Sequence, residues 1–142
     1  HKPVENAVKG VQTLSEPLNA DKILELVNAE RAKVGVAPLV SDQRLVASAQ
    51  TKADDMATNN YYGHINPTTG VNGYEFIPRG IYIYKSENIN AAITSQEAVD
   101  EWLASQPHHD AMLDAKYSLT GIAIAKNPKA DWYYVVQHFC QQ

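Results

Sequence analysis

The stretch from Ser86 to Leu113 restricts the fold more than any other part of this 142-residue chain. Within it, Thr94 is followed three residues later by Glu97, a capping box in which each side chain satisfies a backbone N–H at a helix start. The helix then carries one apolar stripe for burial, formed by Ala98, Val99, Trp102 and Leu103. Because Pro107 cannot lie inside a helix, we expect the chain to turn there and to present His108 and His109 at the turn.

Two further helices are predicted upstream. The first begins at Asn19 or Asp21, both good N-caps, and ends at Gly35. Its inner face carries Ile23, Leu26 and Val27. The second is capped by Ser41 or Asp42 and ends near residue 60. Its buried face carries Leu45, Ala49, Ala53 and Met56.

The strand signals lie mainly in the second half of the chain. Residues 61–70 are rich in turn formers and predict a loop, followed by a short helix around Tyr74–Ile77. A strand is expected from Tyr82 to Ile89. Two stronger runs, Tyr117–Ala125 and Trp132–Cys140, are separated by a short loop and predict an antiparallel hairpin. Helices that precede strands in this way favour an α+β fold with a helix-covered antiparallel sheet.

Length and composition restrict the classes of partner. The chain has the usual size of one domain, and we assign residues 1–18 to an N-terminal arm or linker and residues 19–142 to the domain. A net charge of −4 and the lack of a basic stripe argue against a nucleic-acid partner. No run approaches the roughly 20 apolar residues of a transmembrane segment. The single Cys140 is expected to be a small buried side chain at a strand end.

Three side chains stand out as candidates for chemistry. His64 lies in the turn-rich loop, where a neutral imidazole can bind a metal or act as a base. Glu87 lies in an apolar and aromatic strand, where a buried carboxylate needs a partner. Of the adjacent His108 and His109, one is expected to face the site and the other solvent. Taken alone, His64 is more simply a surface or hydrogen-bonded structural histidine, and Glu97, Asp100 and Glu101 are most simply a solvated helix face. Glu87 is the more telling of the candidates.

Five segments in order resemble the bacterial branch of the CAP superfamily, whose domain is also called SCP and which includes the cysteine-rich secretory, antigen 5 and pathogenesis-related class one proteins. The segments are Asn28–Arg31 with Pro38-Leu39, Gly63–Pro67, Ser86–Ile89, Ala98–His108 and Tyr134–Phe139. The resemblance covers residues 19 to 140. It implies a single-domain α-β-α sandwich with a central antiparallel sheet covered by helices and a cleft that binds Zn²⁺ or a similar divalent cation in some members.

Carried over by position, the resemblance assigns His64 and His108 as metal ligands, with Glu87 as a third ligand, as an acceptor that fixes an imidazole tautomer, or as a catalytic residue. Tyr62, Glu101 and Tyr134 are further candidates for lining the cleft, and the fourth ligand is left open between Glu101, Tyr134 and water. The sequence departs from the eukaryotic pattern at Ser105, where a glutamate is usual, and at Tyr134, where a histidine is usual.

Three functions compete at this stage. The favoured one is a secreted or cell-surface, non-enzymatic binding module that takes a cation, a protein partner or a small hydrophobic or lipid-like ligand, with Tyr61, Tyr62, Tyr74, Tyr82 and Tyr84 lining an amphipathic groove. The second is a metal-assisted hydrolase, such as a peptidase, in which Glu87 is the base. The third is a structural cluster in which Glu87 bridges the imidazoles and holds the His64 loop.

Overall fold

The computed structural model describes residues 17–80 and 83–142. Its elements follow in the order α1 (Ala20–Lys33), β2 (Val40–Ser41), α2 (Gln43–Asn59), η1 (Gly73–Phe76), β3 (Ile83–Ala92), α3 (Ser95–Ala104), α4 (Gln106–Leu113), β4 (Leu119–Lys126) and β5 (Tyr133–Gln141). The predicted arm at residues 1–18 lies outside the described residues except for Pro17, which forms a β-bridge with Thr94, and Leu18. In the described part, no helix is long and apolar enough to cross a membrane.

The strands form one sheet in the order β2-β4-β5-β3. The hairpin of β4 and β5 is antiparallel, as the sequence predicts, and β3 pairs antiparallel with the other side of β5. The two-residue strand β2, which the sequence analysis missed, pairs parallel with the start of β4 and makes the sheet mixed. Strand β3 therefore forms one edge of the described sheet.

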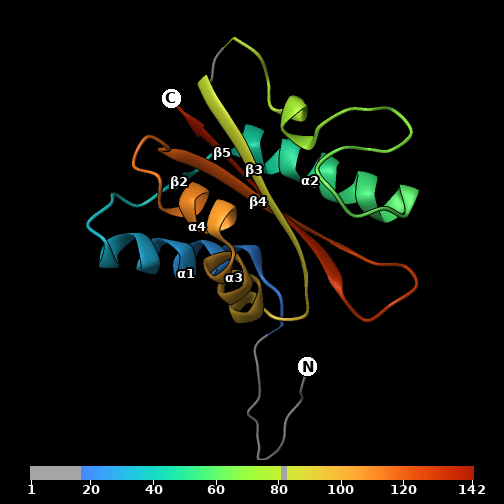
Figure 1. The fold of residues 1–142 in the computed structure, drawn as a ribbon, viewed down its shortest axis with the longest axis horizontal. Coiled ribbons are helices and arrows are strands. Elements are labelled where there is room, and N and C mark those ends of the chain that lie inside the picture. Colours follow the sequence, from blue (N-terminus) through green and yellow to red (C-terminus); the bar gives the residue numbers. More distant parts are fainter. Residues whose placement is uncertain (1–16, 81–82) are drawn as a thin grey trace, which may run out of the picture.

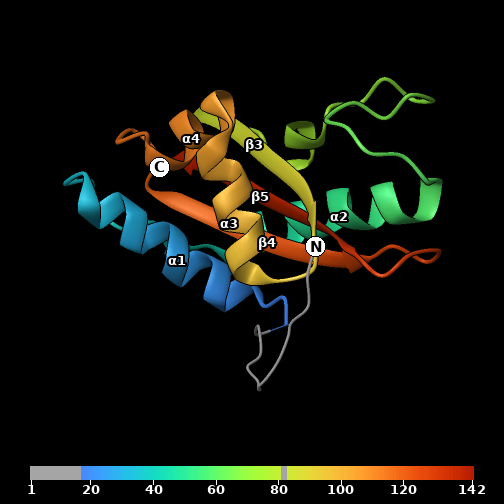
Figure 2. The same cartoon turned by 60° about the horizontal axis from the view of Figure 1, so that its bottom comes forward.

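Helices cover both faces of this sheet (Figures 1 and 2). Successive residues of a strand point to opposite faces, and β5 follows this rule closely. Val135 and Phe139 belong to a core shared with α1, α3 and α4, whereas Val136 packs in a second core with Ala49, Ala53 and Met56 of α2. The fold is the α-β-α sandwich expected from the resemblance.

The helix starts confirm the local predictions. Asn19 caps α1, Asp42 caps α2 and Thr94 caps α3, each through a side-chain oxygen that accepts a backbone N–H of the first turn. The Glu97 carboxylate reaches one residue further back than a standard capping box and accepts the N–H of Ile93 at 2.7 Å. The predicted short helix near Tyr74 is the 3-10 turn η1.

The prediction at Pro107 was only half right. The chain turns at Ser105, but Pro107 lies in the first turn of a new helix, α4. Proline is tolerated there because the N–H that it lacks would have no partner inside the helix. His108 and His109 therefore lie at the start of α4 and not in a loop.

The contact between α2 and β4 depends on Gly121. A Cβ atom added to this glycine would lie 2.1 Å from the backbone of Leu45. We expect Gly121→Ala to push helix and strand apart and to lower the free energy of unfolding by about 3 kcal/mol, measured by urea denaturation. At Gly63 an added Cβ would meet its nearest neighbour at 3.9 Å, so Gly63→Ala is the matched control. Equal stability of the two variants would contradict the packing described here.

Candidate functional site

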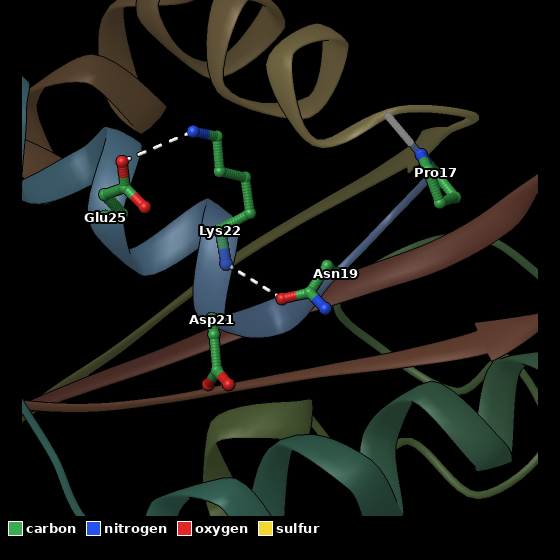
Figure 3. Close-up of a pocket in the computed structure, with 5 residues that line it drawn as sticks. All are labelled: Pro17, Asn19, Asp21, Lys22 and Glu25. Atoms are coloured by element: carbon green, nitrogen blue, oxygen red, sulfur yellow. Dashed lines mark hydrogen bonds and ion pairs between the residues drawn. The ribbon is translucent and has the colours of Figure 1, made fainter. Parts of the chain in front are cut away.

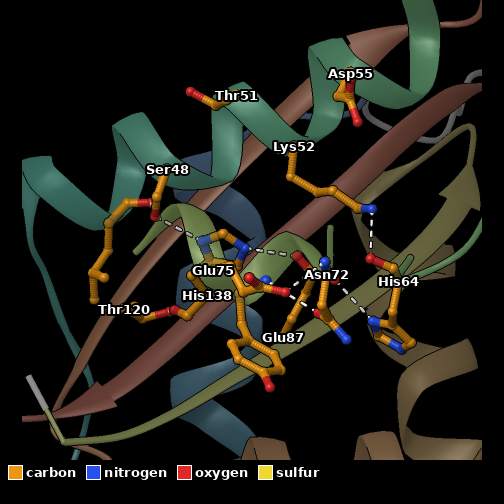
Figure 4. A network of polar contacts seen from close by, with 12 residues as sticks. Ser48, Thr51, Lys52, Asp55, His64, Asn72, Glu75, Glu87, Thr120 and His138 are labelled. Carbon is orange, nitrogen blue, oxygen red and sulfur yellow. Dashed lines mark hydrogen bonds and ion pairs between the residues drawn. The ribbon is translucent and has the colours of Figure 1, made fainter. Parts of the chain in front are cut away.

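The candidate site is built around the carboxylate of Glu87, whose side chain is only 1% exposed (Figure 4). Its Oε1 lies 2.8 Å from Nδ1 of His64, and its Oε2 lies 2.8 Å from Nε2 of His138. The second nitrogen of His138, Nδ1, lies 2.7 Å from Oγ of Ser48 on α2. One hydrogen-bonded chain thus runs from the surface residue His64 through Glu87 and His138 to Ser48.

The hydrogen bonds of Glu87 fix where the protons lie. Burial by itself raises the pKa of this carboxyl, but the hydrogen bonds from His138 and His64 and the charges of His138 and Lys52 outweigh burial and lower it. Glu87 is therefore an ionised acceptor at neutral pH. An ionised carboxylate can only accept, so His64 carries a proton on Nδ1 and His138 carries one on Nε2.

A second network holds the loop that carries His64. The ammonium group of Lys52 is buried between α2 and this loop, and it donates to the His64 carbonyl oxygen at 2.8 Å and to the Tyr61 hydroxyl at 3.0 Å. Burial lowers the pKa of Lys52, against the opposing charges of Glu87 and Asp55. Tyr61 and Asn66 both donate to Oδ2 of Asp55, so the loop is tied to α2 at its start and beyond His64.

Gly73, the first residue of η1, closes the site from the other side. A Cβ atom at this position would lie 2.0 Å from Oε2 of Glu87 and 2.6 Å from the Lys52 side chain. Only glycine leaves room for the carboxylate, and its backbone N–H donates to the His64 carbonyl oxygen at 2.8 Å. The turn at η1 therefore packs directly on the buried charge.

His108 approaches the same region from the opposite layer. Glu87 and Asn88 are consecutive in β3 and point to opposite faces of the sheet. Glu87 binds His64 on the α2 side, whereas Asn88 Nδ2 donates to the His108 carbonyl oxygen at 3.0 Å on the α4 side. Nδ1 of His108 lies 2.9 Å from Oγ of Ser105. Burial lowers the pKa of His108, and the charge of the neighbouring His64 lowers it further.

The other residues predicted to line the cleft lie in different surroundings. Tyr62 is 54% exposed, and its hydroxyl donates to the Ile89 carbonyl oxygen at 3.3 Å. Partial burial raises the pKa of this hydroxyl, and the charge of Glu101 raises it further. Tyr134 is buried in the α2 core, 3.3 Å from the Asn127 amide. Tyr84, near the start of β3, lies close to the ammonium of Lys116. Tyr82 lies outside the described residues.

The sequence analysis missed three members of the site: Ser48, Lys52 and His138. Two sequence patterns could have indicated them. Ser48 and Lys52 follow Leu45 at spacings that place them in the apolar stripe of α2, where a charged residue requires a buried partner. His138 is two residues from Val136 and two from Cys140, so in a strand all three side chains point to the same buried face. The bridge made by Glu87 therefore runs from His64 to His138, and not from His64 to His108.

The donor set for a metal ion is small. Among the residues that the structure describes, no three His, Cys, Asp or Glu side chains form a group suited to hold an ion. Both oxygens of Glu87 already accept imidazole hydrogens, and the protonated Nδ1 of His64 leaves its Nε2 for a ligand. The hydrogen bond that His108 makes with Ser105 also involves Nδ1. Two imidazole nitrogens are fewer protein ligands than a zinc site usually has.

A separate hollow of about 490 Å³ lies beside the start of α1, in the other helical layer (Figure 3). Pro17, Asn19, Asp21, Lys22 and Glu25 line it. Its polar groups serve the helix: Asn19 accepts the backbone N–H of Lys22, and the Lys22 ammonium pairs with Glu25 across one turn. This hollow plays no part in the chemistry around Glu87.

Comparison with known sequences identifies the family. The sequence model of the cysteine-rich secretory protein (CAP) family matches residues 24–139, which include every residue of the site. The chain belongs to the CAP family. A curated relative, the uncharacterised protein YkwD of Bacillus subtilis, is 33% identical over 109 residues, covering 75% of this chain and 42% of that protein.

Solved structures agree with this assignment. An extracellular protein containing an SCP domain from Bacillus anthracis superposes with a TM-score of 0.73 at 27% identity, over 87% of this chain and 40% of that one. An outer surface protein of Borrelia burgdorferi superposes with a TM-score of 0.75 at 17% identity, over 91% of this chain and 99% of that one. This CAP domain spans less than half of YkwD and of the Bacillus anthracis protein.

The lowered pKa of Glu87 predicts a specific response of the CAP domain to acid. A lowered folded-state pKa means that ionised Glu87 stabilises the fold above the usual carboxyl pKa of about 4.3 and that this stability is lost as pH falls through the folded pKa. We expect Glu87→Gln to lower the free energy of unfolding by about 2 kcal/mol at pH 7. Below about pH 4 the free energies of the variant and the wild type should become more similar. Urea unfolding at a series of pH values between about 7 and about 3 measures both.

The control for this experiment is Glu25→Gln. Glu25 is a surface carboxylate, 70% exposed, that pairs with Lys22. A surface pair of this kind contributes less than about 1 kcal/mol, so this variant should follow the wild-type curve. If the free energy of unfolding falls with pH by the same amount in wild type and in Glu87→Gln down to pH 3, the ionised Glu87 carboxylate does not stabilise the fold.

Proposed function

We propose that this chain is an exported, non-enzymatic CAP domain that binds a divalent cation through His64 and His108, with Glu87 as the acceptor that orients His64. The observation that supports this most directly is the state of Glu87. The carboxylate is buried, and each of its oxygens accepts a hydrogen bond from an imidazole. Such a group fixes a tautomer and leaves the opposite nitrogen of the ring to a ligand.

The same observation weighs against the metal-assisted hydrolase. A general base must come within hydrogen-bond reach of the proton that it abstracts from water or substrate. Glu87 is 1% exposed, and Gly73 packs against its Oε2. Each oxygen also accepts a hydrogen bond from an imidazole, which favours a positioning role for the carboxylate over the abstraction of a proton. Binding therefore accounts for the arrangement of Glu87 better than hydrolysis does.

Two imidazoles suit a borderline metal such as Zn²⁺. His64 is held with Nδ1 directed to Glu87, which leaves its Nε2 for a cation. His108 offers Nε2 in the tautomer whose Nδ1–H donates to Ser105. With two protein ligands the cation would be held weakly and would keep water or accept a ligand atom at its other positions. Export is supported by the likeness to the extracellular SCP-domain protein of Bacillus anthracis.

Calorimetric titration with Zn²⁺ tests this proposal. We expect the wild-type chain to bind one ion and both His64→Ala and His108→Ala to abolish the binding. His109→Ala is the matched control, because His109 is next to His108 but lies by Asp110 on the surface of α4. Loss of an acceptor that orients a metal ligand typically costs roughly 10- to 100-fold in affinity, and we expect a loss of that size for Glu87→Gln.

Three results would overturn the proposal. The first is a wild-type chain that binds no Zn²⁺. Unchanged Zn²⁺ binding in both His64→Ala and His108→Ala would place the cation elsewhere. Zn²⁺-dependent cleavage of a peptide or ester that is abolished in Glu87→Gln, while that variant still binds Zn²⁺, would favour the hydrolase instead.

A further inference from the structure

We propose that His138 is a positioning residue: held by Ser48, it anchors Oε2 of Glu87 so that Oε1 fixes the tautomer and the ring orientation of His64. This inference rests on the proposed function, because it concerns the residue that would bind the cation. His138 is fully buried and cannot reach a ligand. Any effect that it has on the surface site must pass through Glu87.

The sheet register places His138 where it can act. Glu87 and His138 are directly paired residues of β3 and β5, and their side chains lie on the same face of the sheet. The pairing leaves a separation of 2.8 Å between Nε2 and Oε2. Because both side chains come from adjacent strands, their relative position is set by the backbone of the sheet.

Ser48 holds the other side of the His138 ring. Its Oγ lies 2.7 Å from Nδ1 of His138 and 3.1 Å from the Leu45 carbonyl oxygen. Both ring nitrogens therefore have partners, one on β3 and one on α2. A ring held at both nitrogens keeps its N–H directed at Glu87, because turning over would break two buried hydrogen bonds.

Gly73 and His138 together determine which carboxylate oxygen faces outward. Oε2 is enclosed by the backbone at Gly73 and by Nε2 of His138, so Oε1 alone is directed at His64. If the His138 donor is removed, Oε2 becomes a buried oxygen that lacks this hydrogen bond, which is costly. The carboxylate would then turn toward the nearby ammonium of Lys52 or take up a proton, and either change weakens its bond to His64.

Two amide variants separate positioning from simple packing. In His138→Gln the amide nitrogen can occupy the place of Nε2 and donate to Glu87. In His138→Asn the shorter amide reaches the place of Nδ1, near Ser48, and cannot reach Glu87. Both variants replace an imidazole with an amide, so they disturb the core to a similar degree. Val136→Ala controls for lost stability, because Val136 is a buried neighbour on the same face of β5 that belongs to the α2 core.

The measurement is the tautomer of His64, read from its two ring ¹⁵N chemical shifts at a pH where the ring is neutral, with no metal added. The wild-type ring should carry its proton on Nδ1. In His138→Asn the ratio of the Nδ1–H to the Nε2–H form should fall several-fold, whereas His138→Gln and Val136→Ala should keep the wild-type ratio. His64→Ala assigns the signals.

The outcomes are distinct. A wild-type ratio in His138→Asn, or an equal fall in His138→Asn and His138→Gln, overturns the positioning role. If His138→Asn does not fold, His138→Met takes its place, since it also lacks a donor for Glu87. The measurement uses no Zn²⁺, so it is independent of the proposed function. If the chain binds no Zn²⁺ but His138→Asn shows the expected tautomer change, the proposed function is wrong and the role of His138 still holds.

Discussion

A carboxylate buried beside a β-sheet is tolerated only when donors surround it, and at Glu87 this requirement shapes the whole α2 side of the molecule. An unpaired charge in this position would cost several kcal/mol. Two donors come from separate parts of the chain, His138 on β5 and His64 in the loop, and the nearby positive charge of Lys52 on α2 adds to their effect. The hydrogen bond between His64 and the buried Glu87 thus attaches the loop after α2 to the sheet.

The position of β3 at the edge of the sheet explains why His64 and His108 lie close enough for the charge of one to affect the other. Alternation along the strand sends Glu87 to one helical layer and Asn88 to the other. Each residue binds the segment that carries one histidine, His64 on the α2 side and His108 on α4. The outward carbonyl of Ile89 accepts the indole N–H of Trp102 at 3.0 Å, which occupies part of the open strand edge. An internal strand, covered on both sides by others, could not bring the two layers together in this way.

Local features could be predicted from the sequence, and features that depend on register could not. Caps at Asn19, Asp42 and Thr94 are encoded within a few residues, and the structure confirms them. The partner of Glu87 depends on how β3 and β5 align across a separation of 51 residues, so His138 could be placed in a buried strand but not against a particular acid. Lys52 could have been predicted as a buried charge, because its spacing from Leu45 and Met56 places it on the apolar face of α2.

The departures from the eukaryotic pattern now have structural explanations. Ser105, where that pattern carries a glutamate, accepts or donates a hydrogen bond at Nδ1 of His108, so the position orients a ring and supplies no carboxylate. Tyr134, where that pattern carries a histidine, is buried in the α2 core. The second imidazole bound to Glu87 comes instead from His138, inside the sheet, where it stabilises the carboxylate and offers nothing to a ligand. Of the two imidazoles that contact Glu87, only His64 lies at the surface.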